Sequence, residues 1–303
     1  MIPERKELEL IHIYMYICDL YDSELKYYCQ RYSNNSNPLF TDQEIITIYL
    51  FAGHCQKYFF VKDIHSFAKD YLLSWFPKLP SYQTFNYRLN LLSEVFKVLS
   101  QRLIESFKPL DCDINTSLVD SMPVITCGSR NRTGKVATEI TNKGYCSTKN
   151  KYYYGLKLHT LAFRRKGTIP FPESMIVTPA QENDLTVFKQ VWGENIHNRT
   201  IIGDKAYSDF EYFDGKKRQK QNIEILTPVK AIKGESEIEK QQKKAFNDLF
   251  STAVSKIRQP IESFFNWLNE KTKIQEAQKV RATSGLIIHT MGKIAAAFIY
   301  LIF

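Results

Sequence analysis

The sequence lacks the features of a secreted protein and of a protein held together by a structural metal ion. Its cysteines form no CxxC or other metal-ligand spacing and suggest no disulfide framework, which fits a reducing cytosol. These cysteines are Cys18, Cys29, Cys55, Cys112, Cys127 and Cys146. The six histidines are scattered, which argues against a structural zinc site. The opening MIPERKELEL carries charges where a signal peptide needs an apolar core, so we expect a cytoplasmic protein.

The chain also lacks internal repeats and low-complexity tracts, and only its tail resembles a membrane segment. Residues 286–303 are apolar and about as long as a bilayer span. They also contain His289 and Lys293, with small residues between them. We therefore expect a buried amphipathic helix that closes the core, and no membrane association.

Positive charge is unevenly distributed along the 303 residues, whose net charge is +9. Residues 1–110 contain 12 Lys/Arg and 12 Asp/Glu, which leaves 29 basic and 20 acidic residues for the remainder. An excess of this kind suits a polyanion such as nucleic acid, although ordinary solubilising charge gives the same composition.

Residues 1–110 are predicted to form a separate helical domain. Thr41 to Glu44 have the spacing of a capping box, ahead of an apolar stripe at Ile45, Ile46, Tyr49 and Leu50. Ser81 is expected to cap a second helix over 82–93. That helix offers Gln83, Asn86, Tyr87 and Arg88 to a DNA groove. We favour a packing helix because the region has no net charge.

Residues 111–303 are predicted to form an α/β domain. Strand-like runs occur at 116–120, 152–163, 174–178, 200–204 and 223–228. Helical stretches follow the third and fourth runs, at 185–192 and 210–220, and a charged helix broken at Pro260 covers 232–283. Three antiparallel strands followed by strand–helix–strand units form an RNase H-like mixed sheet with flanking helices.

Three carboxylates are the candidate catalytic residues. Asp120 and Asp204 each end an apolar run that is expected to be central in the sheet, and such acids meet at one rim. Pro260 suits the first turn of a helix, which would place Glu262 early in that helix, beside an apolar stripe that anchors it. Taken singly, each Asp equally suits a turn cap, and Glu262 equally suits a surface pair with Arg258.

Three convergent carboxylates suit phosphodiester cleavage. Two metal ions about 3.5–4 Å apart activate the attacking oxygen and stabilise the leaving oxygen. Mg²⁺ prefers hard oxygen ligands, so we expect two Mg²⁺ ions on Asp120, Asp204 and Glu262, with Mn²⁺ as a substitute.

A basic stretch over 121–170 holds ten Lys/Arg and one acid, Glu139, interleaved with tyrosines. Cations for phosphates and aromatic rings for stacking suit DNA ends, although a solvated basic face remains an alternative. Strand alternation places at least one of Tyr152, Tyr153 and Tyr154 in the core. The candidate DNA contacts from this stretch are Arg130, Arg132, Lys143, Lys149, Lys157, Arg164 and Arg165.

Five short motifs occur in an order that resembles the catalytic domain of bacterial insertion-sequence DDE transposases. They are Val119-Asp-Ser-Met-Pro123, Lys143-Gly-Tyr145, Tyr154-Gly-Leu-Lys-Leu-His159, Gly203-Asp-Lys-Ala-Tyr207 and Arg258-x-x-x-Glu262. The resemblance runs from about residue 115 to the C-terminus and extends to the N-terminal helical region. It implies metal binding by Asp120, Asp204 and Glu262, and DNA or active-site support roles for Arg258 and Lys205.

The chain departs from relatives that carry a Tyr–Arg–Glu–Lys pattern. Ser255 and Asn269 stand at the Tyr and Lys positions, and Lys271 is the nearest cation. This departure puts the phosphate contacts of the helix in doubt but leaves the three acids untouched. The 58 residues from Asp204 to Glu262 exclude a large inserted domain.

The resulting hypothesis is a transposase that cuts insertion-sequence ends and joins them to target DNA. Its partners would be the terminal repeats, target DNA and a second copy of the chain, with residues 1–110 binding DNA ends or forming the dimer. The alternatives are a metal-dependent nuclease or resolvase without strand transfer, and a non-catalytic transposase-derived DNA-binding protein. A glycosidase with two carboxylates explains neither the basic residues nor the third acid.

Overall fold

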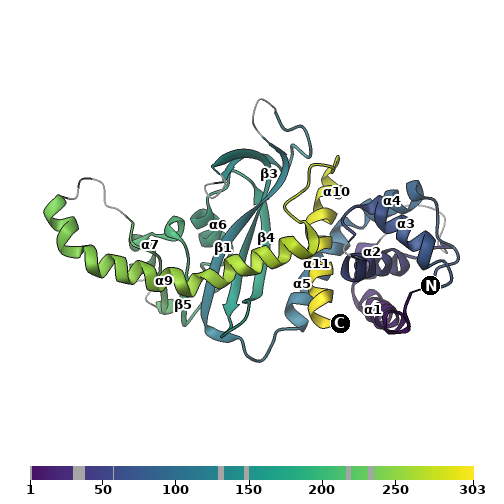
Figure 1. Cartoon of the computed structure of the whole chain (residues 1–303), viewed down its shortest axis with the longest axis horizontal. Helices are drawn as coiled ribbons and strands as arrows, with labels where there is room; N and C mark the ends of the chain where they lie inside the picture. The colour runs from purple at the N-terminus through teal and green to yellow at the C-terminus, as the bar shows by residue number, and fades with distance from the viewer. Residues whose placement is uncertain are drawn as a thin grey trace.

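The computed structural model (Figure 1) describes residues 2–29, 38–56, 58–128, 133–146, 150–215, 220–230, 234 and 236–303. Helices of the N-terminal region lie at one end of the molecule and a twisted sheet lies near its middle. Three of the candidate DNA contacts, Arg130, Arg132 and Lys149, lie outside the described residues.

The N-terminal region is helical, as predicted. Its elements are α1 (Glu4–Ser23), η1 (Leu25–Tyr28), α2 (Asp42–Gln56), α3 (Val61–Tyr71), α4 (Tyr82–Leu91) and α5 (Ser93–Ser106). The capping box at the start of α2 is confirmed, because the Thr41 amide donates to Glu44 Oε2 at 2.6 Å and the Glu44 amide donates to Thr41 Oγ1 at 3.3 Å. Ser81 caps α4 by accepting from the Thr84 amide.

Arg88 on α4 is buried and is not available to a DNA groove, so that part of the prediction is wrong. Its guanidinium donates to Asp42 Oδ1 at 2.7 Å and Oδ2 at 2.6 Å, and to the Cys29 carbonyl at 2.8 Å. The bidentate ion pair between Arg88 and Asp42 holds α4 against α2. The packing interpretation of this helix is therefore the better one, although Gln83 and Tyr87 do face solvent.

The strands of the sheet have the predicted directions. Its described strands are β1 (Asp113–Gly128), β2 (Asn142–Cys146), β3 (Lys151–Arg164), β4 (Phe171–Pro179), β5 (Arg199–Ile202) and β6 (Ile223–Leu226). The order is β4-β3-β1-β5-β6, in which the first three strands are antiparallel and β5 and β6 run parallel to β1. β2 extends the β4 edge of β3 and was not predicted. The RNase H-like mixed sheet is confirmed.

Two hydrophobic clusters cover the two faces of the sheet. Leu118 and Met122 of β1 belong to the larger cluster, which continues through the N-terminal helices and the C-terminal helices. Val119 of β1 and Leu161 of β3 belong to the smaller one, which includes Phe188 of the helix after β4. The alternation along β1 therefore sends neighbouring side chains to opposite layers. α6 (Asp184–Val191) and α7 (Phe210–Asp214) contribute to the second layer.

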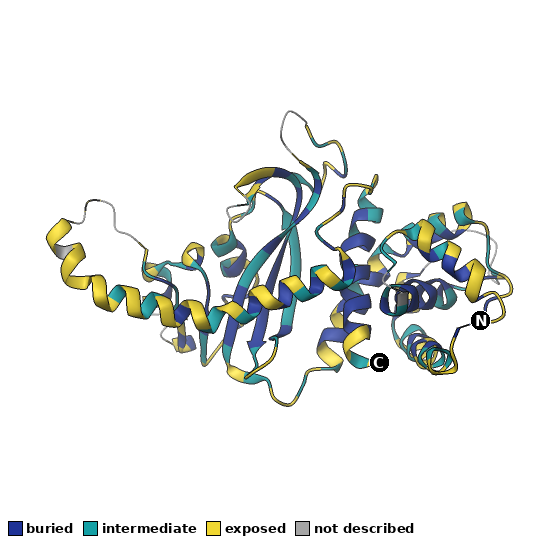
Figure 2. Cartoon of the chain, viewed as in Figure 1, coloured by how far each residue is buried: buried dark blue, intermediate teal, exposed yellow. Residues whose placement is uncertain are grey.

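The long helix α9 (Glu237–Thr272) runs across the sheet (Figure 1). Pro260 lies inside α9 and neither breaks nor starts it, so the prediction of a helix boundary there is wrong. Proline removes one backbone hydrogen bond, and burial of Ile261 and Phe264 against the sheet compensates for that loss. The first half of α9 extends past the sheet and is largely exposed (Figure 2).

The apolar tail closes the core, as predicted. It forms α10 (Thr283–Ile287), the π-helical turn η3 (Ile288–Gly292) and α11 (Lys293–Ile302), and α11 packs against α2, α5 and α9. By length and composition Thr283–Ile302 could cross a membrane, but 61% of its most apolar window is buried within the protein, as core helices are. Burial lowers the pKa of His289 to about 3, and the neutral ring contacts the Ile274 carbonyl at 2.8 Å.

Lys293 generates a pH-dependent stability prediction. Burial lowers its pKa to about 7 from 10.5 in the unfolded chain, while its Nζ donates to the Lys273 carbonyl. Between these two pKa values the unfolded chain binds the extra proton, so stability rises with pH by up to about 1.4 kcal/mol per unit. Lys293→Met should stabilise the protein at pH 7 and flatten this slope. Urea unfolding from pH 7 to 9 measures it.

The exposed Lys256 of α9 provides the control for this prediction. Lys256→Met should leave the pH slope as it is in the unmodified protein. An unchanged slope in Lys293→Met would show that the buried amine is not the source.

Candidate active site

The pairing of β1 with β5 brings Asp120 and Asp204 to the same level of the sheet. Leu118 pairs with Ile202 across the parallel ladder, and each acid lies two residues beyond that pair. β5 ends at Ile202, whereas β1 continues to Gly128 on β3, so Asp120 lies within its strand and not at the predicted strand end. The neighbouring strand β5 stops before the level of Asp120, whose side chain remains mostly buried.

Glu262 and its neighbour Arg258 reach this rim from α9. The Arg258 guanidinium donates from Nη1 to Asp120 Oδ2 at 2.8 Å and from Nη2 to Glu262 Oε1. Both residues share a helical face because they are four positions apart. The Arg258–Glu262 pair expected from the spacing is present, and Arg258 also connects the helix acid to the strand acid Asp120.

Burial is the largest influence on the pKa values of the two aspartates. Burial raises the pKa of Asp120 to about 7, although Arg258 and the Ser121 amide stabilise its charged form. Burial also raises the pKa of Asp204, while its hydrogen bond from the Ala206 amide opposes the shift. A neighbouring acid, Asp184, adds to both increases. Nearby cationic charge would favour the ionised forms.

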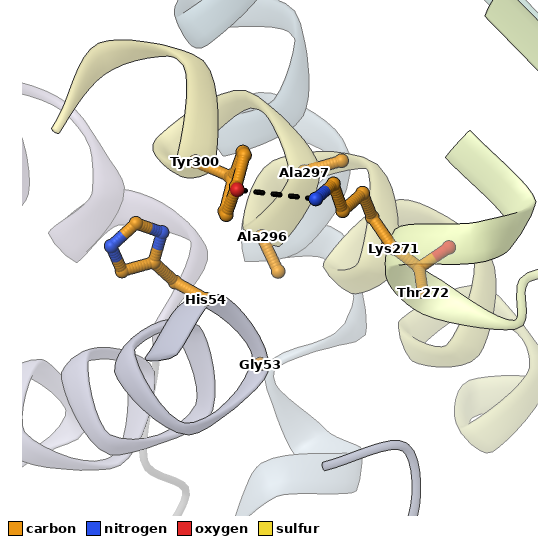
Figure 3. Close-up of a pocket in the computed structure, with 7 residues that line it drawn as sticks. All are labelled: Gly53, His54, Lys271, Thr272, Ala296, Ala297 and Tyr300. Atoms are coloured by element: carbon orange, nitrogen blue, oxygen red, sulfur yellow. Dashed lines mark hydrogen bonds between the residues drawn. The ribbon is translucent and has the colours of Figure 1, made fainter. Parts of the chain in front are cut away.

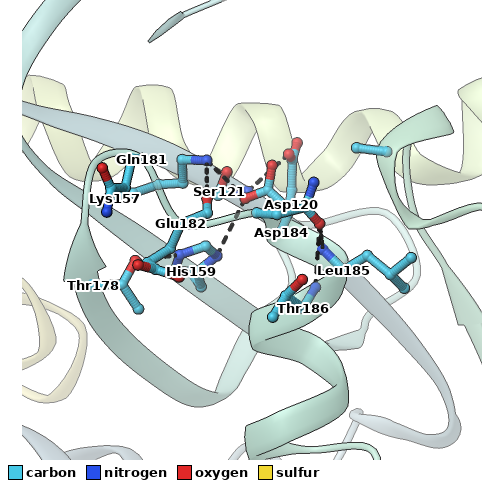
Figure 4. Close-up of polar contacts among 12 residues, drawn as sticks. Asp120, Ser121, Lys157, His159, Thr178, Gln181, Glu182, Asp184, Leu185 and Thr186 are labelled. Carbon is cyan, nitrogen blue, oxygen red and sulfur yellow. Dashed lines mark hydrogen bonds and ion pairs between the residues drawn. The ribbon is translucent and has the colours of Figure 1, made fainter. Parts of the chain in front are cut away.

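Asp184 was not identified from the sequence. It begins α6, where its carboxylate lies 3.4 Å from Lys157 Nζ and 3.3 Å from His159 Nδ1 (Figure 4). Burial raises its pKa, but contacts with His159, Lys157 and Ser121 outweigh that effect and lower it overall. The Lys157 and His159 positions in the third motif were the only sequence signal.

Two buried hydroxyls beside the acids have no hydrogen-bond partner among the described residues. They are Thr160 Oγ1, whose residue pairs with Asp120 across the sheet, and the Tyr207 hydroxyl. Gly203 lets the Tyr207 ring approach, since a Cβ there would lie 2.9 Å from it. Orphaned buried hydroxyls cost about 1–3 kcal/mol each, which water held by a hydrated cation would relieve. The all-oxygen donor set also fits Mg²⁺ or Mn²⁺.

A different group, Glu9, His54 and Cys55, brings its ligand atoms within 4.8 Å of one another. Hydrogen bonding accounts for this cluster. Lys6 Nζ and His54 Nε2 lie 2.6 and 3.1 Å from Glu9 Oε2. Burial raises the pKa of the Cys55 thiol to about 12, so it stays protonated and is a poor metal ligand.

The candidate cations separate into exposed and engaged groups. Lys205 is exposed beside Asp204, and Lys143 is exposed on β2 with its Nζ 4.8 Å from the Tyr152 ring. Tyr145 and Tyr152 are exposed with ring centroids 5.0 Å apart, whereas Tyr153 is buried, which confirms the predicted division of the tyrosines.

The remaining cations are committed to partners or lie elsewhere. Lys157 donates to the Glu182 carbonyl at 2.7 Å, and Arg165 donates to Asp111 at 2.8 Å. The backbone of Arg164 pairs with that of Asp113 in the sheet. Arg164 therefore lies four residues, or about 13 Å, along β3 from Thr160, the residue opposite Asp120. Lys157 and Arg165 are thus engaged within the protein, and Arg164 lies toward the far end of β3 from the acids.

Lys271 does not take the place of the missing cation on α9. It lies nine residues, or about 13 Å, along the helix from Glu262, and its Nζ donates to the Tyr300 hydroxyl at 3.1 Å (Figure 3). The cavity there is only about 10 Å³. A larger groove of about 630 Å³ lies between α5, β4 and the C-terminal helices. The described residues that line it include none of the three candidate catalytic acids.

Comparison with known proteins gives one match. A family model described as Transposase DDE domain matches residues 111–298. No curated protein and no solved structure matches the chain. The matched range includes all six strands and both ends of the Arg258 bridge.

The Arg258 bridge predicts unequal couplings to its two acids. Asp120 is mostly buried and Glu262 is about half exposed, with side-chain exposures of 17% and 51%. A double-mutant cycle of Arg258→Ala with Asp120→Asn should give a coupling of about 1–3 kcal/mol. The cycle with Glu262→Gln should give less than about 1 kcal/mol because solvent screens the pair.

Urea unfolding of the single and double variants measures both couplings. If both coupling energies were near zero, Arg258 would be an ordinary surface arginine that does not hold the two acids together.

Proposed function

Because the chain belongs to the family of transposase DDE domains, we propose that it cuts insertion-sequence ends and transfers the freed strands into target DNA. The observation that carries the proposal is the convergence of Asp120 and Asp204 at one level of the sheet, with Glu262 linked to Asp120 through Arg258. Family membership establishes a transposase with a DNA substrate and divalent-metal chemistry. Cleavage followed by joining is the finer part of the proposal.

Asp120, Asp204 and Glu262 would hold two Mg²⁺ ions, with Mn²⁺ as a substitute. When bound, the ions activate the attacking oxygen and stabilise the leaving oxygen of the phosphodiester. Asp120 lies in β1, Asp204 follows the adjacent parallel strand β5, and Glu262 lies on the helix that crosses them. Arg258 neutralises part of their charge and so lowers the repulsion that DNA phosphates would meet there.

DNA would approach from the exposed cations and aromatic rings. Lys205 lies at the rim, and the pair of Lys143 and Tyr152 offers a charge and a stacking surface on the β2–β3 hairpin. We retain Arg130, Arg132 and Lys149 as proposed contacts on sequence grounds. The N-terminal region over 1–110 would bind ends or form a homodimer, since two ends must be joined together. Because its substrate would be bacterial DNA, we retain the expectation of a cytoplasmic protein.

Strand-transfer products separate this proposal from a nuclease or resolvase. The purified protein is incubated with Mg²⁺, its own element's flanking ends and a target plasmid, and the products are mapped. Joined donor–target molecules support a transposase that completes both steps. Cleaved ends without joined products would favour the nuclease, and intact DNA would favour a non-catalytic binding protein.

The acids generate the central prediction. Asp120→Asn, Asp204→Asn and Glu262→Gln should each abolish cleavage while end binding stays within a few-fold, because metal ligands stabilise the transition state but make few phosphate contacts. Gel shift and single-turnover cleavage measure the two properties. Asp209→Asn is the matched control, since Asp209 caps α7 and pairs with Lys189. Cleavage by any acid variant at the control rate would remove that residue from the site.

A second prediction concerns salt. Lys143→Gln with Lys205→Gln should flatten the slope of log affinity against log salt by about 0.9 for each phosphate that the protein no longer neutralises. Arg164→Gln with Arg165→Gln should leave the slope nearly unchanged, because these residues lie away from the acids and Arg165 already pairs with Asp111. The reverse pattern would place DNA on the opposite end of the sheet.

A further inference from the structure

We propose that Asp184 is a fourth carboxylate of the metal site, held there by Lys157 and His159. This inference deepens the proposed function and depends on the site of Asp120, Asp204 and Glu262. It extends the metal-binding set beyond the three acids to the first residue of α6.

Helix capping does not explain the carboxylate of Asp184. The cap of α6 is the preceding residue, Asn183, whose Oδ1 accepts from the amides of Leu185 at 3.0 Å and Thr186 at 3.2 Å. The orphan amides at this helix start therefore have their acceptor already. The Asp184 carboxylate is directed to the sheet instead (Figure 4).

Three strand residues fix the position of Asp184. His159 is fully buried on β3, and its Nε2 lies 2.8 Å from Thr178 Oγ1 of β4, which orients the ring. Its Nδ1 and the Lys157 ammonium then lie 3.3 and 3.4 Å from the same oxygen, Oδ1, of Asp184. Lys157 is fixed in turn by the Glu182 carbonyl. Lys157 and His159 thus restrain the Asp184 carboxylate in the way that outer partners orient the ligands of a metal ion.

Ser121 lies between Asp184 and the candidate acid Asp120. Its amide donates to Asp120 Oδ1 at 2.8 Å, and Asp120, Ser121 and Asp184 lie together in Figure 4. The two acids thus lie on either side of one β1 residue. The negative charge of Asp184 opposes the ionisation of both Asp120 and Asp204 and adds to the rise in their pKa values.

The Tyr207 hydroxyl is an independent sign of a ligand among these acids. It is 1% exposed, has no hydrogen-bond partner among the described residues, and is acted on by Asp184, Asp120 and Asp204 together. A buried hydroxyl without a partner beside three carboxylates is costly in isolation. Water bound to a cation that all three acids attract would supply its hydrogen bond.

Manganese titration of the full-length protein tests the assignment without relying on activity. Mn²⁺ binding is measured by calorimetry and by the loss of the free-ion paramagnetic resonance signal. Asp184→Asn should weaken binding by about 10–100-fold, as Asp204→Asn does. Glu182→Gln is the matched control, because it removes a carboxylate two residues away and keeps the backbone carbonyl that Lys157 uses. It should bind Mn²⁺ as the unmodified protein does.

The outcomes separate the two levels of the proposal. If Asp184→Asn binds Mn²⁺ as tightly as the unmodified protein while Asp204→Asn binds it more weakly, Asp184 is not a metal ligand. The proposed function would then remain intact. Unmodified affinity in both Asp120→Asn and Asp204→Asn would overturn the metal site itself. Asparagine keeps an oxygen for Lys157, so the variant is expected to melt cooperatively. If it does not, Asp184→Ser is titrated instead, and unmodified affinity there would equally reject the assignment.

Discussion

Like charges that are forced together at one rim are the constraint on which the rest of this structure depends. Asp120, Asp204 and Glu262 come from a strand, a loop and a helix, and without counter-charge they would repel one another and any DNA. Arg258 reduces that repulsion by bonding two of the three. Burial nevertheless raises the pKa of Asp120, with smaller contributions from Asp204 and Asp184.

The register between β1 and β5 determines whether these charges meet at all. Leu118 pairs with Ile202, and both acids follow at the same offset. A slip of one residue would turn Asp120 to the opposite layer and bring Val119 to the α9 face, because strand side chains alternate. The apolar residues before each acid thus specify the active site as well as the core. Packing and chemistry here depend on the same alternation.

Local signals in the sequence were sufficient for the strand directions and for the N-caps at Thr41 and Ser81. They failed where tertiary contact decides the outcome. Pro260 has the local preference of a helix start, but burial of α9 on the sheet outweighs the missing hydrogen bond. Asp184 follows the N-cap residue Asn183, and its position in the sequence is that of an ordinary acidic residue in the first turn of a helix. Only the fold shows that β3 holds it beside Asp120.

The continuity of α9 through Pro260 has a consequence for how the site is held. Arg258 and Glu262 are one turn apart on the same rigid element, so neither can move relative to Asp120 without the other. The buried Ile261 and Phe264, next to them in the sequence, fix the rotation of that element against the sheet. A helix that began at Pro260 would leave Arg258 in a preceding loop, free to separate from Glu262. The uninterrupted helix therefore makes the bridge and the third acid a single unit, positioned by the same hydrophobic contacts that stabilise the domain.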